Sequence, residues 1–104
     1  MNSVNFIGRT TADIEIKKSA SGSSYCSFNL AINRPKSEGS EQEADYPRIV
    51  AFGKLAENAE KYVKKGSLIG VEGRVQTSKY EKDGVTNYTT EFIASRIEYL
   101  ALKE

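Results

Sequence analysis

Histidine and tryptophan are absent from this 104-residue sequence, and cysteine occurs once, at Cys26. The chain therefore lacks the side chain that most often acts as a general base or a metal ligand near neutral pH. One cysteine can form neither an internal disulfide nor a thiolate zinc site. We expect no enzymatic activity, no metal and no cofactor, and we expect Cys26 to be a small buried side chain in a reducing cytoplasm.

Other familiar signals are missing as well. Neither glycine-rich phosphate-binding loop, G-x-x-x-x-G-K-[ST] or G-x-G-x-x-G, occurs in the chain. No apolar run approaches the roughly 20 residues that span a bilayer, and the polar start does not resemble a signal peptide. The composition, 38% hydrophobic and 28% charged, is that of a soluble globular protein. The length predicts one domain that covers residues 1–104.

The charge is almost balanced, with a net charge of +1, whereas nucleic-acid-binding domains are usually basic. However, Glu38, Glu41, Glu43 and Asp45 all fall in one stretch that begins at Ser37, and the rest of the chain is clearly basic. We interpret this acidic stretch as a solvated loop. Weak binding of a cation by its carboxylates is the alternative.

Period-two alternation of polar and apolar residues predicts the first three strands. The first runs from Val4 to Gly8 and, after a bend near Gly8 to Thr11, continues from Asp13 to Lys17. The second covers Cys26 to Asn33, and the third covers Tyr46 to Phe52.

The period then changes to that of a helix, from Lys54 to Lys65, with Gly66 as its stop. The stripe that we expect to be buried consists of Leu55, Ala59, Tyr62 and Val63.

Two further strands follow the helix. The fourth, Ser67 to Gln76, contains Gly73 where a barrel strand would bend. Asp83-Gly84 predicts a tight hairpin that leads to a fifth strand, Asn87 to about Leu100. The order β-β-β-α-β-β predicts an all-β protein with one short helix: an OB-fold, a five-stranded Greek-key barrel with the helix between strands three and four. Such barrels commonly bind oligonucleotides or oligosaccharides.

Candidate binding residues begin on the third strand, where parity places on one face Tyr46, Arg48, Val50 and Phe52. Burying Arg48 without a partner would cost several kcal/mol, so we expect this face to lie in water. Rings beside cations suit single-stranded nucleic acid, because bases stack on rings and phosphates attract cations. Spacing alone leaves Phe52 compatible with either stacking or core packing.

Tyr80 stands between Lys79 and Lys82 at the base of the Asp83-Gly84 hairpin, where it is a second stacking candidate. The alternative is a ring that only stabilises the hairpin. Cations near strand ends or on outward positions are candidate phosphate contacts, although each by itself is equally a solubilising charge: Arg9, Lys17, Arg34, Lys36, Lys54, Arg74 and Lys79.

From Val4 to Leu100 the chain resembles bacterial and phage single-stranded DNA-binding proteins. The resemblance rests on six segments that have the same order and spacing as in that family. They are Asn5–Arg9, Phe28–Ala31, Arg48–Glu57, Lys64–Ser67, Val71–Arg74 and Tyr88–Glu91. The resemblance implies an OB-fold, a homotetramer, and binding of single-stranded DNA in replication, recombination and repair. The sequence leaves a dimer open as the alternative assembly. The resemblance also implies a place in the bacterial nucleoid or the phage-infected cell, and it matches Tyr46, Phe52 and Tyr80 to stacking positions of the family.

Two departures from the family pattern affect these expectations. A stacking position that is often tryptophan corresponds here to roughly Lys36, so we expect a phosphate contact in place of one stacked base. The family also carries an acidic tail that recruits replication and repair proteins, whereas this sequence stops at Glu104. An OB-fold accessory protein that acts mainly by docking other proteins therefore remains an alternative. A module for structured RNA or carbohydrate is a further alternative.

Overall fold

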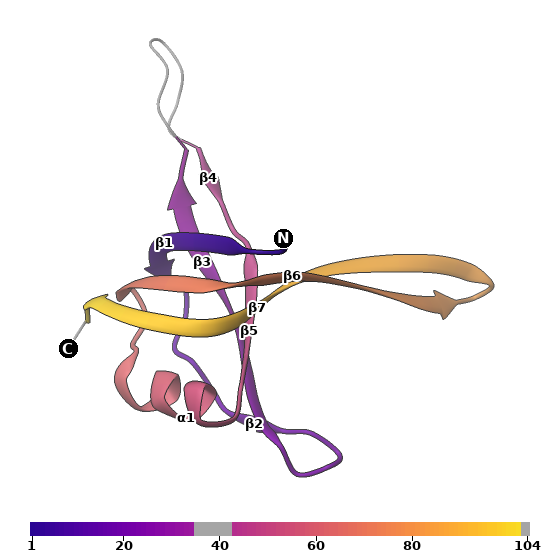
Figure 1. Ribbon diagram of the computed structural model, residues 1–104, viewed down its shortest axis with the longest axis horizontal. Coiled ribbons are helices and arrows are strands. Elements are labelled where there is room, and N and C mark those ends of the chain that lie inside the picture. Colours follow the sequence, from indigo (N-terminus) through magenta and orange to yellow (C-terminus); the bar gives the residue numbers. More distant parts are fainter. Residues whose placement is uncertain (35–42, 103–104) are drawn as a thin grey trace.

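The computed structural model describes residues 1–34 and 43–102. Within these residues the chain forms seven strands and one helix, labelled in Figure 1. In chain order they are β1 (Val4–Thr10), β2 (Lys17–Lys18), β3 (Ser24–Asn33), β4 (Ala44–Asp45), β5 (Arg48–Phe52), α1 (Gly53–Tyr62), β6 (Leu68–Lys82) and β7 (Val85–Ala101).

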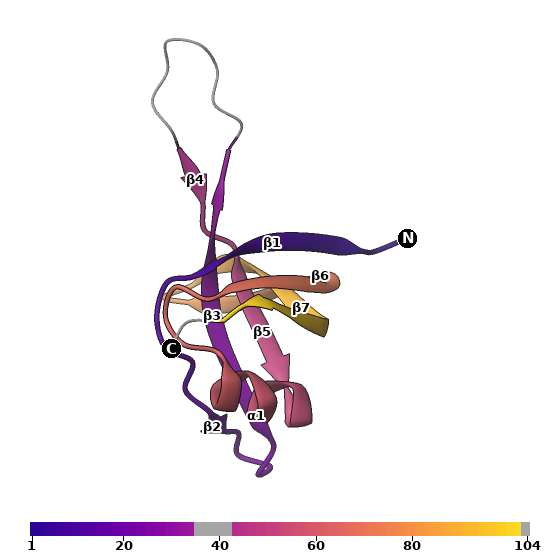
Figure 2. The ribbon, with the colours of Figure 1, turned by 90° about the vertical axis from the view of Figure 1, so that its left-hand side faces the viewer.

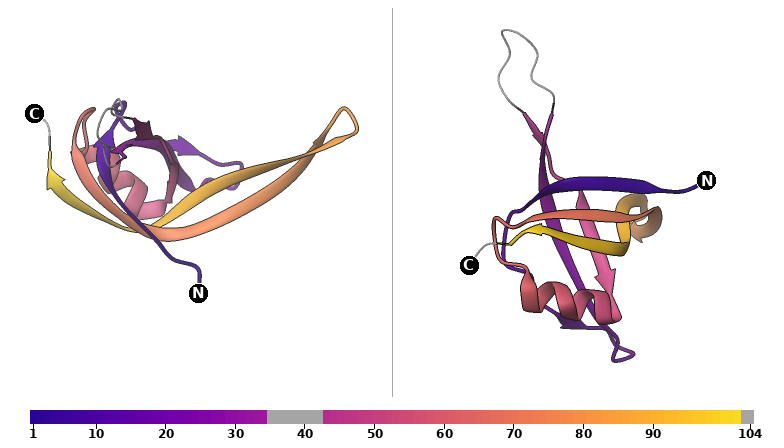
Figure 3. Two further views of the ribbon diagram at one scale, coloured as in Figure 1. Left: turned by 90° about the horizontal axis from the view of Figure 1, so that it is seen from above. Right: turned by 60° about the vertical axis from the view of Figure 1, so that its left-hand side comes forward.

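Five of the strands close into a barrel, seen from above in Figure 3. The order around it is β1, β6, β7, β5, β3 and back to β1. Closure depends on β1, which pairs with β6 from Val4 to Arg9 and with β3 through Arg9 and Thr10. Strands β5 and β7 are parallel, and the other neighbours are antiparallel. This arrangement is the predicted Greek-key barrel of the OB-fold.

The barrel is filled by the apolar residues that alternate along β3, β5 and β6. The buried set includes Cys26, Phe28, Leu30, Ile49, Ala51, Ile69 and Val71. Cys26 has no exposed surface, as predicted, and burial raises the pKa of its thiol to about 11. The thiol is therefore protonated at neutral pH and packs as a small apolar side chain.

Helix α1 closes one end of the barrel, as Figure 2 shows. The predicted buried stripe is wrong at Tyr62, which is 46% exposed, whereas Ala56 is buried beside Ala59 and Val63. Small side chains at the contact let a helix approach its neighbour closely, so the alanines rather than the tyrosine face the barrel.

The helix ends at Tyr62, three residues earlier than predicted, because the next residues bond to the last residue of β1 and to the segment that follows it. The Thr10 hydroxyl donates to the Lys64 carbonyl at 2.8 Å, and the Lys65 N–H donates to the Asp13 carboxylate at 2.8 Å.

The predicted strand from Asp13 to Lys17 is wrong except at its end, where Lys17 and Lys18 form β2. The segment runs along the helix instead of along a strand. There the Ile16 N–H donates to the Glu60 carboxylate at 2.6 Å, and Ile14 is buried.

Strands β6 and β7 extend past the barrel as a two-stranded arm, formed by residues 76–82 and 85–91. Figure 1 shows the arm projecting away from the other strands. Asp83 and Gly84 have φ angles of 54° and 78°, which confirms the predicted tight hairpin. Both strands are longer than predicted, because cross-strand pairing continues from Gln76↔Glu91 to Lys82↔Val85 after burial has ended.

Over the described ranges, no helix combines the length and apolar character that crossing a bilayer requires.

Candidate nucleic-acid interface

The candidate interface is the water-facing side of β3, β5, β6 and β7, which we call the outer face. Residues directly opposite each other on paired strands share a face. The strand register aligns three rows across this face: Lys17, Tyr25 and Phe52; Ser27, Val50, Ile93 and Arg74; and Asn29, Arg48, Glu91 and Gln76.

The first row carries two aromatic rings beside a cation. Phe52 is 52% exposed, so its ring is not sealed in the core. The half-buried Tyr25 lies next to it, with ring centroids 6.4 Å apart and planes inclined at 40°. Lys17 pairs with Tyr25 on the other side. Sequence reasoning did not single out Tyr25, although its parity with Ser27 and Asn29 on the polar face of the strand could have indicated it.

Arg48 occupies the middle of the third row, and its side chain is 60% exposed. Arg48 therefore lies in water, as predicted. The prediction is wrong at Val50 on the same face, which is only 6% exposed because it lies between Ser27 and Ile93 of the neighbouring strands. The Arg48 guanidinium is held loosely, 3.9 Å from the Glu91 carboxylate and 3.4 Å from the Ser27 hydroxyl. An exposed ion pair of this length contributes little to stability, so the guanidinium can turn to another anion at small cost.

Tyr46 lies just before β5 and is 60% exposed. Strand β5 begins at Arg48, two residues later than predicted, because Pro47 has no N–H to donate to a ladder. The Asn29 side chain donates to the Tyr46 carbonyl at 3.1 Å. Tyr46 therefore lies beside Asn29, the first residue of the third row.

The outer face continues onto the arm. Successive side chains of a strand point to opposite sides. Gln76 lies two positions after Arg74 along β6, and Tyr80 lies four positions after Gln76, so the three side chains lie on one side of the strand. The Arg74 guanidinium donates to the Gln76 side-chain oxygen at 2.9 Å, and Tyr80 is 50% exposed.

Lys79 lies on the opposite side of the arm from Tyr80, although the two are neighbours in sequence. It pairs with Tyr88 of β7, and directly paired residues share a face. Tyr88 is 75% exposed. Sequence reasoning did not consider Tyr88 as a binding residue, yet the two-residue hairpin that it predicted already implies this register.

Three further predicted phosphate contacts lie outside the three rows. Arg9 is on β1, where it donates to the Gly66 carbonyl at 2.9 Å. Lys54 is exposed in the first turn of α1, two residues after Phe52. Arg34 follows β3, and Lys36 lies outside the described residues.

Arg34 is held by two carboxylates at the base of the β3–β4 hairpin. Its guanidinium bonds to Glu43 at 2.6 Å and to Asp45 at 2.7 Å. The hydrogen bond from Arg34, together with its charge, holds the pKa of Asp45 below its usual value. A phosphate would have to compete with both carboxylates for this guanidinium.

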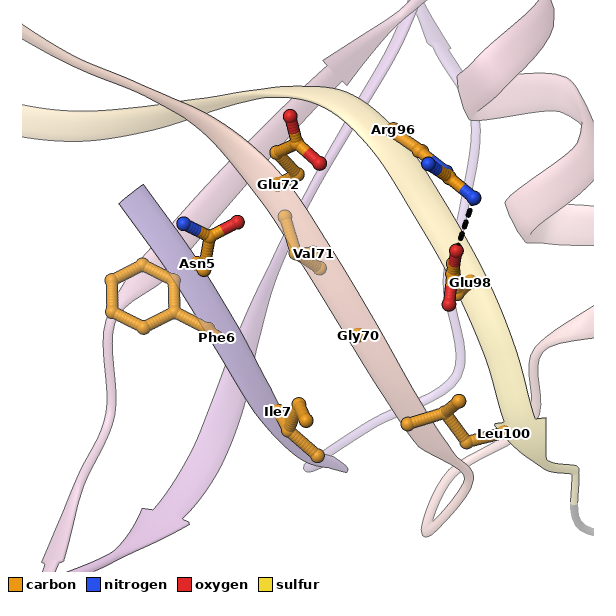
Figure 4. A pocket seen from close by; sticks show the side chains of 9 residues that line it. All are labelled: Asn5, Phe6, Ile7, Gly70, Val71, Glu72, Arg96, Glu98 and Leu100. Carbon is orange, nitrogen blue, oxygen red and sulfur yellow. Dashed lines mark hydrogen bonds and ion pairs between the residues drawn. The ribbon is translucent and has the colours of Figure 1, made fainter. Parts of the chain in front are cut away.

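A separate pocket lies on β1, β6 and β7, where Ile7 and Leu100 flank Gly70, as Figure 4 shows. Its charged residues are Glu72, Glu98 and Arg96, and Arg96 is paired with Glu98. Two carboxylates against one neutralised guanidinium disfavour a polyanion, so we do not place nucleic acid there.

Among residues 1–34 and 43–102, no group of three or more His, Cys, Asp or Glu side chains could hold a metal ion. The carboxylates proposed to bind a cation weakly lie partly outside these residues.

Comparisons with known proteins identify the family. The chain is 45% identical over 106 residues to "Single-stranded DNA-binding protein 3" of Listeria innocua, an alignment that covers 100% of this chain and 66% of the relative. It is 46% identical over 105 residues to "Single-stranded DNA-binding protein 1" of Staphylococcus aureus, covering 99% and 67%. The chain thus spans about two thirds of the length of these relatives.

A solved structure has the same fold. It is the "Plasmodium falciparum SSB complex with ssDNA", with a TM-score of 0.85, 26% sequence identity and coverage of 96% of this chain and 95% of that chain. The model of the "Single-strand binding protein family" matches residues 1–100. This chain belongs to the single-strand binding protein family.

Proposed function

We propose that this protein binds single-stranded DNA without strong sequence preference and acts in DNA replication, recombination and repair. The observation that carries the proposal is the outer face, where exposed rings and cations lie side by side across paired strands. Family membership and the likeness to an SSB complex with single-stranded DNA support it.

The rings would supply the attraction for bases. Phe52, with Tyr25 beside it, and Tyr80 on the arm expose aromatic surface at two places on the same face. Tyr46 lies at the edge of that face. Stacking of a base on such a ring contributes about 1–3 kcal/mol and tolerates any base, since every base has a π-face. Bases in a duplex are already stacked and paired, so these rings select single strands.

The cations would supply the attraction for phosphates. Lys17, Arg48 and Arg74 lie within the three rows, and Lys54 follows Phe52. Where a DNA strand continues beyond the three rows, its phosphates would contact Arg9, Arg34, Lys36 and Lys79. Binding of phosphates releases counterions and makes the affinity fall as salt rises.

We also propose binding without catalysis, in the cytoplasm of a bacterial or phage-infected cell, and assembly into a homo-oligomer, a tetramer or a dimer. Strand β1 supports the assembly, because Val4–Gly8 pair with β6 on one side while pairing with β3 begins only at Arg9. A strand edge of this kind can pair with another chain.

Tyrosine fluorescence tests the proposed function, because the chain has six tyrosines and no tryptophan. Titration with oligo-dT should quench the emission, since bases stack on Tyr25, Tyr46 and Tyr80, and duplex of equal length should have little effect. A Tyr62→Phe variant should be quenched almost as strongly, because Tyr62 lies on α1 against Tyr99. An equal response to both nucleic acids, or none, would favour an accessory protein that acts by docking.

A further inference from the structure

The two-stranded arm has two faces, and the strand register assigns each residue to one of them. On the first face, Tyr80 pairs with Asn87, Ser78 with Thr89 and Gln76 with Glu91. This face continues into the outer face of the barrel through Arg74. Of the residues that the proposed function places on the arm, Tyr80 lies on this side and Lys79 lies on the other.

The second face continues into the inside of the barrel. Val75 pairs with Phe92 at the base of the arm, and the Phe92 ring packs on Phe6 with centroids 5.0 Å apart. Farther out, this face carries Thr77 with Thr90 and then Lys79 with Tyr88. The positions that hold core residues within the barrel thus hold exposed residues on the arm.

Tyr88 leaves 75% of its surface in water, more than any other tyrosine or phenylalanine among the large hydrophobic residues exposed in the described chain. A ring in this position gains little from burial, so packing does not account for an aromatic residue here. Lys79 is directly opposite it on the partner strand. The second face therefore presents one flat ring and one cation together, the same combination as the outer face.

We propose that Tyr88 and Lys79 form a second single-strand-binding surface on the arm, in which Tyr88 stacks a base and Lys79 contacts the neighbouring phosphate. This inference rests on the proposed function. A strand that reaches the end of the arm would pass around it and meet rings on both sides, first Tyr80 and then Tyr88. The arm would then bind at least two bases that are not stacked on each other.

A double-mutant cycle on the full chain tests this inference, with a dye-labelled oligo-dT of about 30 nucleotides, longer than the roughly 4–16 nucleotides bound by one OB-fold. Tyr88→Thr removes the ring but keeps a residue that favours strands. We expect a loss of affinity of about five-fold or more, comparable with the loss in Tyr80→Thr. Because the two rings would stack different bases, the losses should multiply in the double variant.

Two further variants separate binding from folding. Tyr88→Phe keeps the ring and should bind like the wild type, while all variants should retain the wild-type melting temperature because the arm lies outside the core. Lys79→Gln should reduce the slope of log affinity against log salt by about one.

The contrary outcomes are distinct. Wild-type affinity in Tyr88→Thr overturns the second surface, as does a double variant no weaker than Tyr80→Thr alone. A change in sedimentation without a change in affinity would assign Tyr88 to contacts between protein copies and also overturn it. Failure of the wild type to bind oligo-dT would instead reject the proposed function itself.

Discussion

At the scale of single residues, the outer face shows side chains whose positions do little for stability. Fully burying a phenylalanine side chain contributes about 1.5–3 kcal/mol, and Phe52 is 52% exposed. Roughly half of that contribution is therefore not realised in the free protein. Arg48 likewise has only a 3.9 Å ion pair with Glu91. A base stacked on Phe52 or a phosphate paired with Arg48 would therefore supply stabilisation that these side chains lack in the free protein.

Gly73, unlike Phe52 and Arg48, matters for the stability of the fold, because the fold leaves no room for a side chain at this position. The register of β6 and β7 shifts between Glu72 and Gly73, which confirms the predicted bend. A Cβ at Gly73 would lie 2.0 Å from the Ile93 carbonyl oxygen, and backbone atoms cannot yield as a flexible side chain can. At Gly70, on the same strand, the nearest atom would be 3.8 Å away.

We therefore predict that Gly73→Ala lowers the free energy of unfolding by about 1–3 kcal/mol or more, the usual cost of forcing atoms into a packed site. Gly70→Ala is the matched control and should change it by less than about 0.5 kcal/mol. Urea unfolding followed by circular dichroism measures both. Equal stability of the two variants would show that the β6–β7 bulge can relax without cost.

At the scale of elements, the arm is an extension whose shape depends on its turn. Asp83 and Gly84 both adopt positive φ, which glycine accepts readily and a β-branched residue does not. Apart from the turn, the exposed strands of the arm are held in register by their cross-strand pairs, from Gln76↔Glu91 to Lys82↔Val85. A change in the turn should therefore disturb the arm while leaving the barrel intact.

Gly84→Val should weaken binding of oligo-dT, because it loosens the register that places Tyr80, and it should leave the melting temperature of the barrel nearly unchanged. Asp83→Asn is the control, since Asn-Gly forms the same turn. Amide hydrogen exchange should show faster exchange at Thr77–Lys82 in the valine variant only. A large fall in melting temperature would show instead that the arm and the barrel unfold as one unit.

At the scale of the whole molecule, the placement of charge matters more than its sum. The net charge of +1 gives little long-range attraction for DNA. However, Lys17, Arg48 and Arg74 lie within one face, and the acidic residues Glu43 and Asp45 bond to Arg34 at the base of the β3–β4 hairpin. We therefore expect the attraction for phosphates to be local to the outer face.

Arg48→Gln and Lys61→Gln remove the same unit of charge, and we predict different effects on DNA binding. Arg48 lies in the third row, whereas Lys61 lies near the end of α1 with its ammonium 5.3 Å from the centre of the Tyr62 ring. Only Arg48→Gln should reduce the salt dependence of oligo-dT affinity, by about one in the log–log slope. Equal slopes in the two variants would mean that net charge, rather than the outer face, attracts the DNA.

The sequence by itself determined the barrel, and it indicated which residue types the candidate interface exposes. Alternation along β3, β5 and β6 revealed the core, because a strand with one wet face must carry this pattern. Asp83-Gly84 identified the hairpin, since few other residues accept two positive φ angles. Arg48 was correctly predicted to lie in water, because its charge is too costly to bury without a partner.

The tertiary structure decided what depends on contacts between distant segments. Pairing of Tyr25 with Phe52 formed the two-ring row, and pairing of Lys79 with Tyr88 separated Lys79 from Tyr80. The early end of α1 came from bonds to Thr10 and Asp13. Local patterns record whether a residue is buried or exposed, whereas strand register decides which exposed residues become neighbours.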